Sequence, residues 1–211
     1  IRGHTLDQFV DKFASCGFNR EVFHPGYGMA ETTLMVSASK KSQAPSEIWV
    51  NTETLSQREI ALDDAAVAEN NSRFVSSGYV DADRTIENHH VKIVNPDTRI
   101  CCAENEVGEI WVQSPSVTQG YYGKEELTKT VFKATIAGEE DQNYLRTGDM
   151  GFIVDGNLFI AGRIKDLIII RGKNYAPEDI ESTAYVDSQV LQDNGAAAFS
   201  VEHENQEKLV L

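Results

Sequence analysis

Apolar residues near the start of the chain recur three or four positions apart, as they do along one face of an amphipathic helix. The positions that carry this pattern are Leu6, Phe9, Val10 and Phe13. Thr5 and Gln8 have the spacing of a capping box, and Gly17 ends the pattern. The sequence therefore predicts a surface helix of about three turns.

Between positions 18 and 77 the patterning is weaker. Residues 18–31 contain too much glycine, proline and aromatic side chain for a helix, which predicts a strand end followed by a loop. Residues 37–47 are polar, as an exposed connection would be. Residues 54–77 allow at most one short helix, near residues 63–68. We expect mostly loop in this stretch.

Short strands are predicted from Val91 onward. The runs with strand-like patterning are residues 91–94, 107–113, 152–154 and 158–161. Asp155 and Gly156 separate the last two runs, and this pair tolerates the positive φ angles that a tight hairpin needs. We therefore expect a small antiparallel sheet.

A strand, helix, strand pattern follows the predicted sheet. Residues 167–170 form an apolar run, and Pro177 suits the first position of a helix whose start carries two acidic residues. Residues 195–201 and 207–211 are patterned as further strands. We place a domain boundary near Lys165, where the sheet-rich part ends.

The composition is that of a globular protein, since 41% of the 211 residues are apolar and the formal net charge is −14. A chain of this length allows one or two domains. The acidic excess disfavours binding to nucleic acid or to an anionic membrane surface, and no apolar run approaches the roughly 20 residues of a membrane-spanning helix. Three cysteines without disulfide-like spacing fit a reduced compartment, so we expect a cytoplasmic protein.

Three segments are candidates for chemistry. They are residues 27–32 (YGMAET), residues 144–149 (YLRTGD), and residues 162–166 (GRIKD), which run on to residues 172–177 (GKNYAP). Together and in this order they resemble the motifs of the adenylate-forming superfamily, the AMP-binding or acyl-CoA synthetase-like enzymes. The details are most similar to fatty acyl-AMP ligases, and the resemblance runs over the whole chain.

The resemblance implies an α+β fold in two parts. Residues 1–164 would be the β-rich C-terminal portion of a large adenylate-forming N-terminal domain, and residues 165–211 a hinge and the start of a small α/β C-terminal domain. Residues 37–56 look like the insertion that marks fatty acyl-AMP ligases, although an exposed loop without function is the alternative. Because the chain starts without methionine and stops within a strand-like run, we expect a piece of a longer protein.

Asp149 and Arg163 are the candidates for binding a ribose. Asp149 follows a strand on a Thr-Gly turn, where its carboxylate can accept hydrogen bonds from two neighbouring hydroxyls. Arg163 lies across the predicted hairpin and can present its guanidinium at the same end of the sheet. Taken alone, they are an ordinary turn and a surface arginine; the other motifs favour the functional interpretation.

The segment from Tyr27 to Glu31 is the candidate for holding the rest of a nucleotide. The Glu31 carboxylate can bind Mg²⁺ against phosphates, because hard cations prefer oxygen ligands. Tyr27 and the bare backbone of Gly28 would let an adenine ring pack closely. Gly26 and Gly28 do not make a dinucleotide-binding fingerprint, because Glu31 stands in the place of the third glycine.

The resemblance adds further residues to the expected site. To nucleotide binding it assigns Met29, Ala30 and Ile160. Ala30 stands where many acyl-CoA ligases have threonine, which fits the acyl-AMP branch. The resemblance makes Lys165 the hinge about which the small domain turns, and it puts Arg171 and Gly172 along the path of a pantetheine thiol.

The implied activity is the ATP- and Mg²⁺-dependent conversion of a fatty acid to an acyl-adenylate, followed by transfer of the acyl group to an acyl carrier protein. The chain lacks the phosphate loop and the late catalytic lysine of such enzymes, since Lys208 comes too early, so we expect it to be inactive alone. Three alternatives stay open. The first is transfer to coenzyme A, the second is a non-catalytic nucleotide- or partner-binding module that retains the motifs, and the third is a plain structural fragment.

Overall fold

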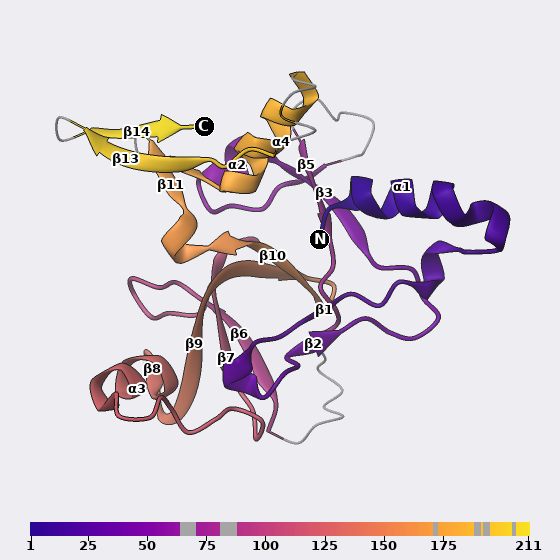
Figure 1. The fold of residues 1–211 in the computed structure, drawn as a ribbon. Helices are drawn as coiled ribbons and strands as arrows, with labels where there is room; N and C mark the ends of the chain where they lie inside the picture. The colour runs from indigo at the N-terminus through magenta and orange to yellow at the C-terminus, as the bar shows by residue number, and fades with distance from the viewer. Residues whose placement is uncertain (64–70, 81–87, 171–172, 188–190, 192–194, 204–205) are drawn as a thin grey trace.

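The centre of the molecule is an antiparallel sheet (Figure 1). Among the described residues, its strands carry more than half of the buried apolar side chains. The computed structural model describes residues 1–63, 71–80, 88–170, 173–187, 191, 195–203 and 206–211. The strand order is β10-β9-β7-β6, and β8 also pairs with β9. The bounds are β6 His90–Val94, β7 Gly108–Gln113, β8 Ala134–Ile136, β9 Glu139–Val154 and β10 Asn157–Arg163. The predicted sheet is confirmed, but β9 begins well before the strand expected at residue 152.

Asp155 and Gly156 join β9 to β10, as predicted. Their φ angles are 49° and 73°, the left-handed conformation that a two-residue hairpin needs to match the twist of its strands. The hairpin aligns Phe159 with Phe152, and the two stacked rings have centroids 5.4 Å apart. The turn thus holds β10 in register beside β9.

Both faces of the sheet are packed. Along β7, Ile110 and Val112 belong to one apolar cluster and Trp111 to another, and all three are fully buried. Successive side chains of a strand point to opposite faces, so positions 110–112 of β7 are all apolar where a half-exposed strand would alternate. Helix α3 (Glu125–Phe132), which the sequence did not predict, adds Phe132 to the first cluster.

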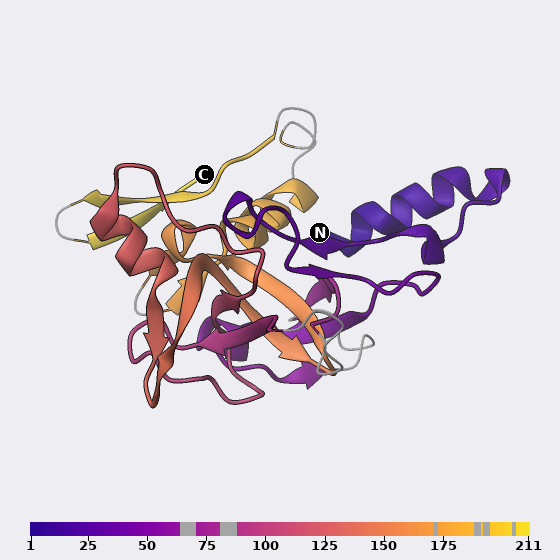
Figure 2. The ribbon, with the colours of Figure 1, turned by 90° about the horizontal axis from the view of Figure 1, so that it is seen from below.

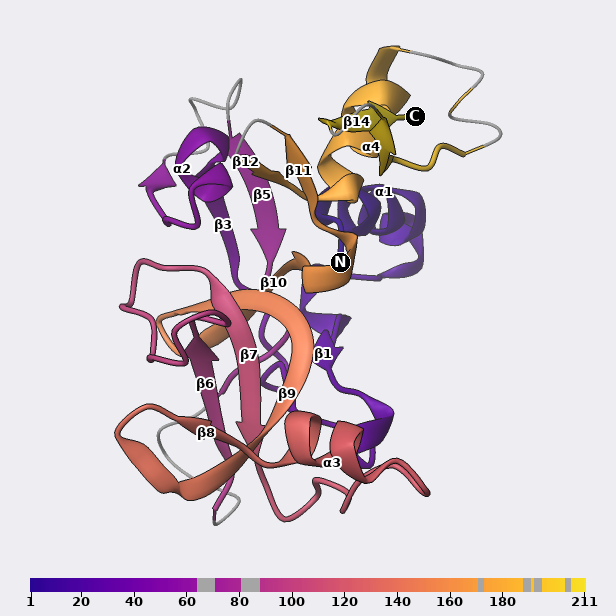
Figure 3. The ribbon, with the colours of Figure 1, turned by 90° about the vertical axis from the view of Figure 1, so that its left-hand side faces the viewer.

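A second sheet, of order β4-β3-β5, lies above the central sheet in Figure 3. Its elements are β3 Glu47–Asn51, β4 Leu62–Asp63 and β5 Asn71–Val75, with α2 (Thr52–Ser56) after β3. Val50 is fully buried, and the ring of Phe74 meets that of Phe152 edge-on at 5.3 Å.

The expectation of mostly loop was therefore wrong for this part of the chain. Strand β5 lies in the mixed, polar stretch 54–77, and its Phe74 packs against Phe152 of the central sheet; such a distant contact can stabilise a strand, because strand preference depends on the neighbours a side chain meets. The short helix expected near residues 63–68 is not seen at Asp63, which belongs to β4, and its other positions lie outside the described residues.

Helix α1 (Gly3–Phe13) extends away from the central sheet (Figure 2). It begins two residues before the predicted cap, and Arg2 at its N-cap makes no side-chain capping bond, so the capping box was wrong. Gly17 ends the following turn η1 (Ala14–Cys16) with φ 79°, as predicted. The ring of Phe9 packs against three others on this helix and after it: Phe13, Phe18 and Phe23.

Four charged residues, Asp7, Arg20, Glu47 and Arg73, connect α1 to the second sheet. Both arginines bridge the two carboxylates. The hydrogen bond from Arg73, followed by that from Arg20, lowers the pKa of Asp7 to about 2. Only two residues of α1, Gly3 and Leu6, are buried. The ion-pair cluster is therefore a main attachment of the helix to the second sheet.

The C-terminal part follows the predicted strand, helix, strand order. Its elements are η5 Ile164–Asp166, β11 Ile168–Ile170, β12 Lys173–Tyr175, α4 Pro177–Asp187, β13 Phe199–His203 and β14 Gln206–Val210. Pro177 takes the first position of α4, as predicted. A domain boundary at Lys165 stays a prediction. Within the described part of the chain, no helix is long and apolar enough to cross a membrane.

Candidate active site

Asp149 lies inside β9, at a point where the strand departs from regular pairing. On one side it pairs in register with Arg163 of β10. On the other side the register between β7 and β9 shifts, and Gly148 has φ 74°. The sequence had placed Asp149 beyond the end of a strand; the structure shows a continuous strand with an irregular turn in it. The residue is buried, with 7% of its surface exposed.

Each oxygen of the Asp149 carboxylate accepts a hydrogen bond from another segment. The Tyr27 hydroxyl donates to Oδ2 at 2.6 Å, and Arg163 Nε donates to Oδ1 at 3.0 Å. Burial, with this hydrogen bond to Asp149, raises the pKa of Tyr27, so the phenol keeps its proton and remains a donor. The Arg163 side chain is 65% exposed, which leaves the rest of its guanidinium open to a ligand.

Tyr27 is held by protein contacts, and its expected contact with an adenine ring stays a prediction. It stands in β1 (Gly26–Tyr27), which pairs with β2 (Ser37–Ala38), and its ring packs against the apolar cluster that contains Val36 and Ile110. Met29 and Ile160, also predicted site residues, pack against the same cluster. The Tyr27 hydroxyl, which donates to Asp149, ties the loop that carries Glu31 to the central sheet.

Glu31 lies on the short turn η3 (Ala30–Thr32) and is also held by a phenol. The Tyr121 hydroxyl donates to Glu31 Oε1 at 2.6 Å, and the Thr118 N–H donates to the Glu31 carbonyl at 2.8 Å. The hydrogen bond to Glu31, together with burial, raises the pKa of Tyr121 to about 12. Glu31 is half-buried, and its second carboxylate oxygen has no hydrogen-bond partner among the described residues.

Helix α3 holds Tyr121 in turn. The Tyr121 N–H donates to Thr128 Oγ1 at 2.9 Å, and the ring meets Phe132 edge-on at 5.1 Å. Sequence reasoning missed Tyr121, although it follows a glycine and precedes a second tyrosine and glycine in a loop, a composition similar to that of the Tyr27 segment.

Gly28 is required by close packing of the backbone. A Cβ at this position would lie 1.7 Å from the Leu34 carbonyl oxygen. The loop after it is closed by Thr32, whose buried hydroxyl donates to the Met29 carbonyl at 2.9 Å. Ala30 is exposed at the start of η3. The absence of a side chain at Gly28 therefore lets two backbone segments of one loop meet, and the close approach of an adenine ring there stays a prediction.

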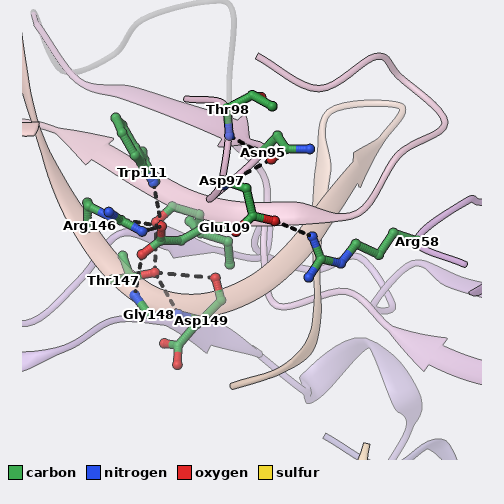
Figure 4. Close-up of polar contacts among 11 residues, drawn as sticks. Arg58, Asn95, Asp97, Thr98, Glu109, Trp111, Arg146, Thr147, Gly148 and Asp149 are labelled. Atoms are coloured by element: carbon green, nitrogen blue, oxygen red, sulfur yellow. Dashed lines mark hydrogen bonds and ion pairs between the residues drawn. The ribbon is translucent and has the colours of Figure 1, made fainter. Parts of the chain in front are cut away.

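A buried glutamate lies behind the Thr-Gly-Asp turn (Figure 4). Glu109 on β7 accepts hydrogen bonds from Trp111 Nε1 at 2.8 Å, Arg146 Nε at 2.9 Å and the Gly148 N–H at 3.0 Å. Sequence reasoning missed this residue too. The signal was a lone acidic residue inside the apolar run 107–113, since charged residues are rarely buried without partners.

The remaining predicted residues lie apart from these contacts. Lys165 is exposed on η5, directly after β10. Arg171 and Gly172 lie outside the described residues. An apolar cavity of about 510 Å³ between α2 and α4 is lined by none of the predicted site residues.

The charge arrangement suits one divalent cation that brings its own oxygen ligands. The described residues contain no group of three or more His, Cys, Asp or Glu side chains that could bind a metal by themselves. Mg²⁺ is commonly held by one or two carboxylates together with substrate phosphates and waters. The half-buried Glu31 carboxylate, fixed through one oxygen, fits that role.

Comparison with known proteins defines the class. A protein-family profile described as AMP-binding enzyme matches residues 3–122, more than half of the chain. The chain therefore belongs to the AMP-binding enzyme family.

Individual relatives agree with this assignment. Over its whole length the chain is 40% identical to the medium-chain-fatty-acid–acyl-carrier-protein ligase JamA of Moorena producens, and it covers 35% of that protein. Over 98% of its length it is 37% identical to FadD25 of Mycobacterium tuberculosis, which is named as a fatty-acid–CoA ligase and of which it covers 34%.

A solved structure agrees as well. The fatty acyl-adenylate ligase from Legionella pneumophila, in complex with acyl adenylate and pyrophosphate, matches 99% of this chain with 37% identity and a TM-score of 0.71. The chain covers 35% of that structure. The predicted α+β fold and the resemblance to fatty acyl-AMP ligases are both confirmed, for a chain that spans about a third of their length.

Proposed function

We propose that the full-length protein containing this chain activates a fatty acid with ATP and passes the acyl group to a carrier-protein thiol. In the first step a carboxylate oxygen of the acid attacks the α-phosphorus of ATP. The bond from that phosphorus to the bridging oxygen breaks, and pyrophosphate leaves. The observation that carries the proposal is the buried Asp149 carboxylate, held by Tyr27 and Arg163.

The Asp149 carboxylate suits a ribose because two of its acceptor positions are still available. An ionised carboxylate has about four lone-pair sites, and Tyr27 and Arg163 occupy one on each oxygen. Two vicinal hydroxyls can donate to the remaining ones. The protein contacts fix the orientation of the carboxylate before a ligand arrives, which reduces the entropy cost of binding.

Glu31 and Arg163 supply the charges that a nucleotide needs. The Glu31 carboxylate would hold Mg²⁺, whose charge lowers the repulsion between the phosphates and the incoming carboxylate. The exposed guanidinium of Arg163 would contact ribose or phosphate oxygens. Gly28, Met29, Ala30 and Ile160 would shape the surface on which the nucleotide lies.

The domain organisation is part of the same proposal. Residues 1–164 would end the large domain, Lys165 would be the hinge, and residues 165–211 would begin the small domain, with Arg171 and Gly172 near the thiol path. Residues 37–56, which contain β2, β3 and all of α2, would be the insertion. The name of JamA supports the carrier-protein branch, and that of FadD25 supports the coenzyme A alternative. The name of the Legionella pneumophila ligase supports formation of an acyl-adenylate.

The test is mass spectrometry of products formed by the full-length protein from lauric acid, Mg-ATP and coenzyme A, with and without a phosphopantetheinylated carrier protein. We expect acyl-AMP with little acyl-CoA, and acylated carrier when it is present. Abundant acyl-CoA would establish the alternative. Absence of any adenylate, with Asp149→Ala leaving nucleotide affinity unchanged, would point to a non-catalytic module.

The isolated 211-residue chain provides a second check. We expect it to catalyse no ATP–pyrophosphate exchange, because the chain contains neither a phosphate loop nor the late lysine. Robust exchange by the isolated chain would contradict this part of the proposal.

A further inference from the structure

The register shift between β7 and β9 places a bulge at the candidate nucleotide site. Glu109 pairs with Met150 and Trp111 pairs with Arg146, so one residue of β7 faces three residues of β9. Those three are residues 147–149, the Thr-Gly-Asp segment. Bulges disrupt the regular pairing of a ladder and redirect side chains, and they are common beside active sites.

Side chains take the place of the missing ladder bonds. Glu109 Oε1 accepts from the Gly148 N–H at 3.0 Å. Thr147 Oγ1 accepts from the Asp149 N–H at 3.1 Å and donates to the Ile110 carbonyl at 2.7 Å. Each residue of the bulge is therefore attached to a side chain or to β7.

The second oxygen of Glu109 is also fully used. Oε2 accepts from Trp111 Nε1 at 2.8 Å and from Arg146 Nε and Nη2 at 2.9 and 2.7 Å. Glu109 is 2% exposed, in a strand whose other buried side chains are apolar. A buried carboxylate is costly unless its acceptors are satisfied, and an apolar residue would avoid that cost. Unlike an apolar residue, the Glu109 carboxylate supplies a hydrogen-bond acceptor for the Gly148 N–H of the bulge.

We propose that Glu109 is a positioning residue for ribose recognition: its buried carboxylate holds the 147–149 bulge so that Asp149 faces Tyr27 and Arg163. The inference rests on the proposed function, because it takes Asp149 as the residue that binds the ribose hydroxyls. Glu109 lies behind the turn, and it acts through the backbone of Gly148. It is not a catalytic residue.

The test is nucleotide discrimination by the full-length protein. Initial rates of adenylate formation are measured with ATP and with 2′-deoxy-ATP, and the ratio of the two kcat/KM values is compared between variants. An enzyme that is less stable but correctly arranged loses activity with both nucleotides alike, so its ratio is unchanged. An enzyme in which Asp149 is displaced loses the contact with the ribose 2′-hydroxyl, which ATP has and 2′-deoxy-ATP lacks, so its ratio falls.

The key variant is Glu109→Gln, which keeps the shape of the side chain but turns one acceptor into a donor facing Trp111 and Arg146. We expect the preference for ATP to fall about tenfold, since displacements of about 1 Å in a site have effects of that order or larger. Glu106→Gln, an exposed position three residues earlier, is the matched control and should keep the ratio.

Two more variants keep the test decisive. Thr147→Val has nearly the same shape and removes the acceptor of the Asp149 N–H, so it should lower the ratio even if Glu109→Gln does not fold. Asp149→Asn should abolish most of the preference.

The outcomes separate the two claims. A ratio that falls in Asp149→Asn and in the Glu109 and Thr147 variants supports the inference. A ratio that falls in Asp149→Asn alone overturns the role of Glu109 and leaves the proposed function standing. A ratio that survives in Asp149→Asn overturns ribose recognition by Asp149, and the inference with it.

Discussion

The two carboxylates of the candidate site come from regions that are stabilised in different ways. Asp149 stands on a strand paired on both sides, between the buried residues Leu145 and Phe152. Glu31 stands on a three-residue turn after a two-residue strand, held by the Tyr121 hydroxyl and the Thr118 N–H. Many contacts of the strand fix the position of Asp149, whereas a few contacts of the turn fix that of Glu31. Single substitutions should therefore act more strongly around Glu31.

The largest effect is expected from Gly28→Ala in the full-length protein. The added Cβ would lie 1.7 Å from the Leu34 carbonyl oxygen, so the loop backbone that carries Glu31 must move. We expect ATP–pyrophosphate exchange to fall about 100-fold, the cost of misplacing a group in a site.

Gly148→Ala is the comparison on the strand side. A Cβ there meets no atom within 4 Å, so its cost is the left-handed φ of 74°, about 1–2 kcal/mol. Exchange should fall clearly less than in Gly28→Ala. Equal losses in the two variants would contradict the difference between the regions.

A smaller effect is expected from Tyr121→Phe. The change removes one hydrogen bond to a carboxylate, worth about 1.5–3 kcal/mol, and leaves the ring against Phe132. The Mg²⁺ concentration for half-maximal adenylate formation should rise about tenfold, because a loss of about 1.4 kcal/mol in binding free energy weakens affinity by that factor. Tyr27→Phe keeps the Tyr121 bond to Glu31 and removes only the bond that ties the loop to Asp149, so it should raise that Mg²⁺ concentration clearly less.

The smallest effect concerns the ion-pair cluster of α1. Because the folded pKa of Asp7, about 2, lies below the ordinary value of 3.8, its ionised form stabilises the fold above about pH 4. That contribution is lost as the pH falls from about 4 to 2. Asp7→Asn should lower the free energy of unfolding at pH 7 by roughly 0.5 kcal/mol, since the side chain is partly exposed and screened by solvent.

Urea unfolding at several pH values measures this effect. The difference between the original protein and Asp7→Asn should shrink as the pH approaches 2, while the exposed control Asp11→Asn should differ little at any pH. A difference that is the same at pH 7 and pH 2 would show that charge is not the cause.

The sequence predicted some parts of the fold and missed others. The strands with continuous apolar runs, the Asp155-Gly156 hairpin and the start of α4 at Pro177 were visible in the sequence, because each depends on local patterning or turn chemistry. The second sheet was not, since β5 lies in a mixed, polar stretch and its Phe74 packs against Phe152, a residue far away in the sequence. Local composition carries no record of such a distant neighbour.

The site shows the same limit. Motif residues such as Asp149 and Glu31 could be named, but not the hydroxyls that hold them. Tyr27 is 122 positions from Asp149, and Tyr121 is 90 positions from Glu31. Hydrogen bonds over such separations follow from the fold as a whole, so the partner of a motif residue has to be read from the structure.

The hydrogen bond from the Gly148 N–H to Glu109 should slow the exchange of that amide proton with water. A glycine amide in a left-handed turn ordinarily exchanges its proton with water quickly, because water reaches it easily. Here the N–H donates to a buried oxygen, so we expect its deuterium uptake to be as slow as that of the neighbouring strand amides. This one amide would therefore report whether the turn is intact, with no nucleotide present.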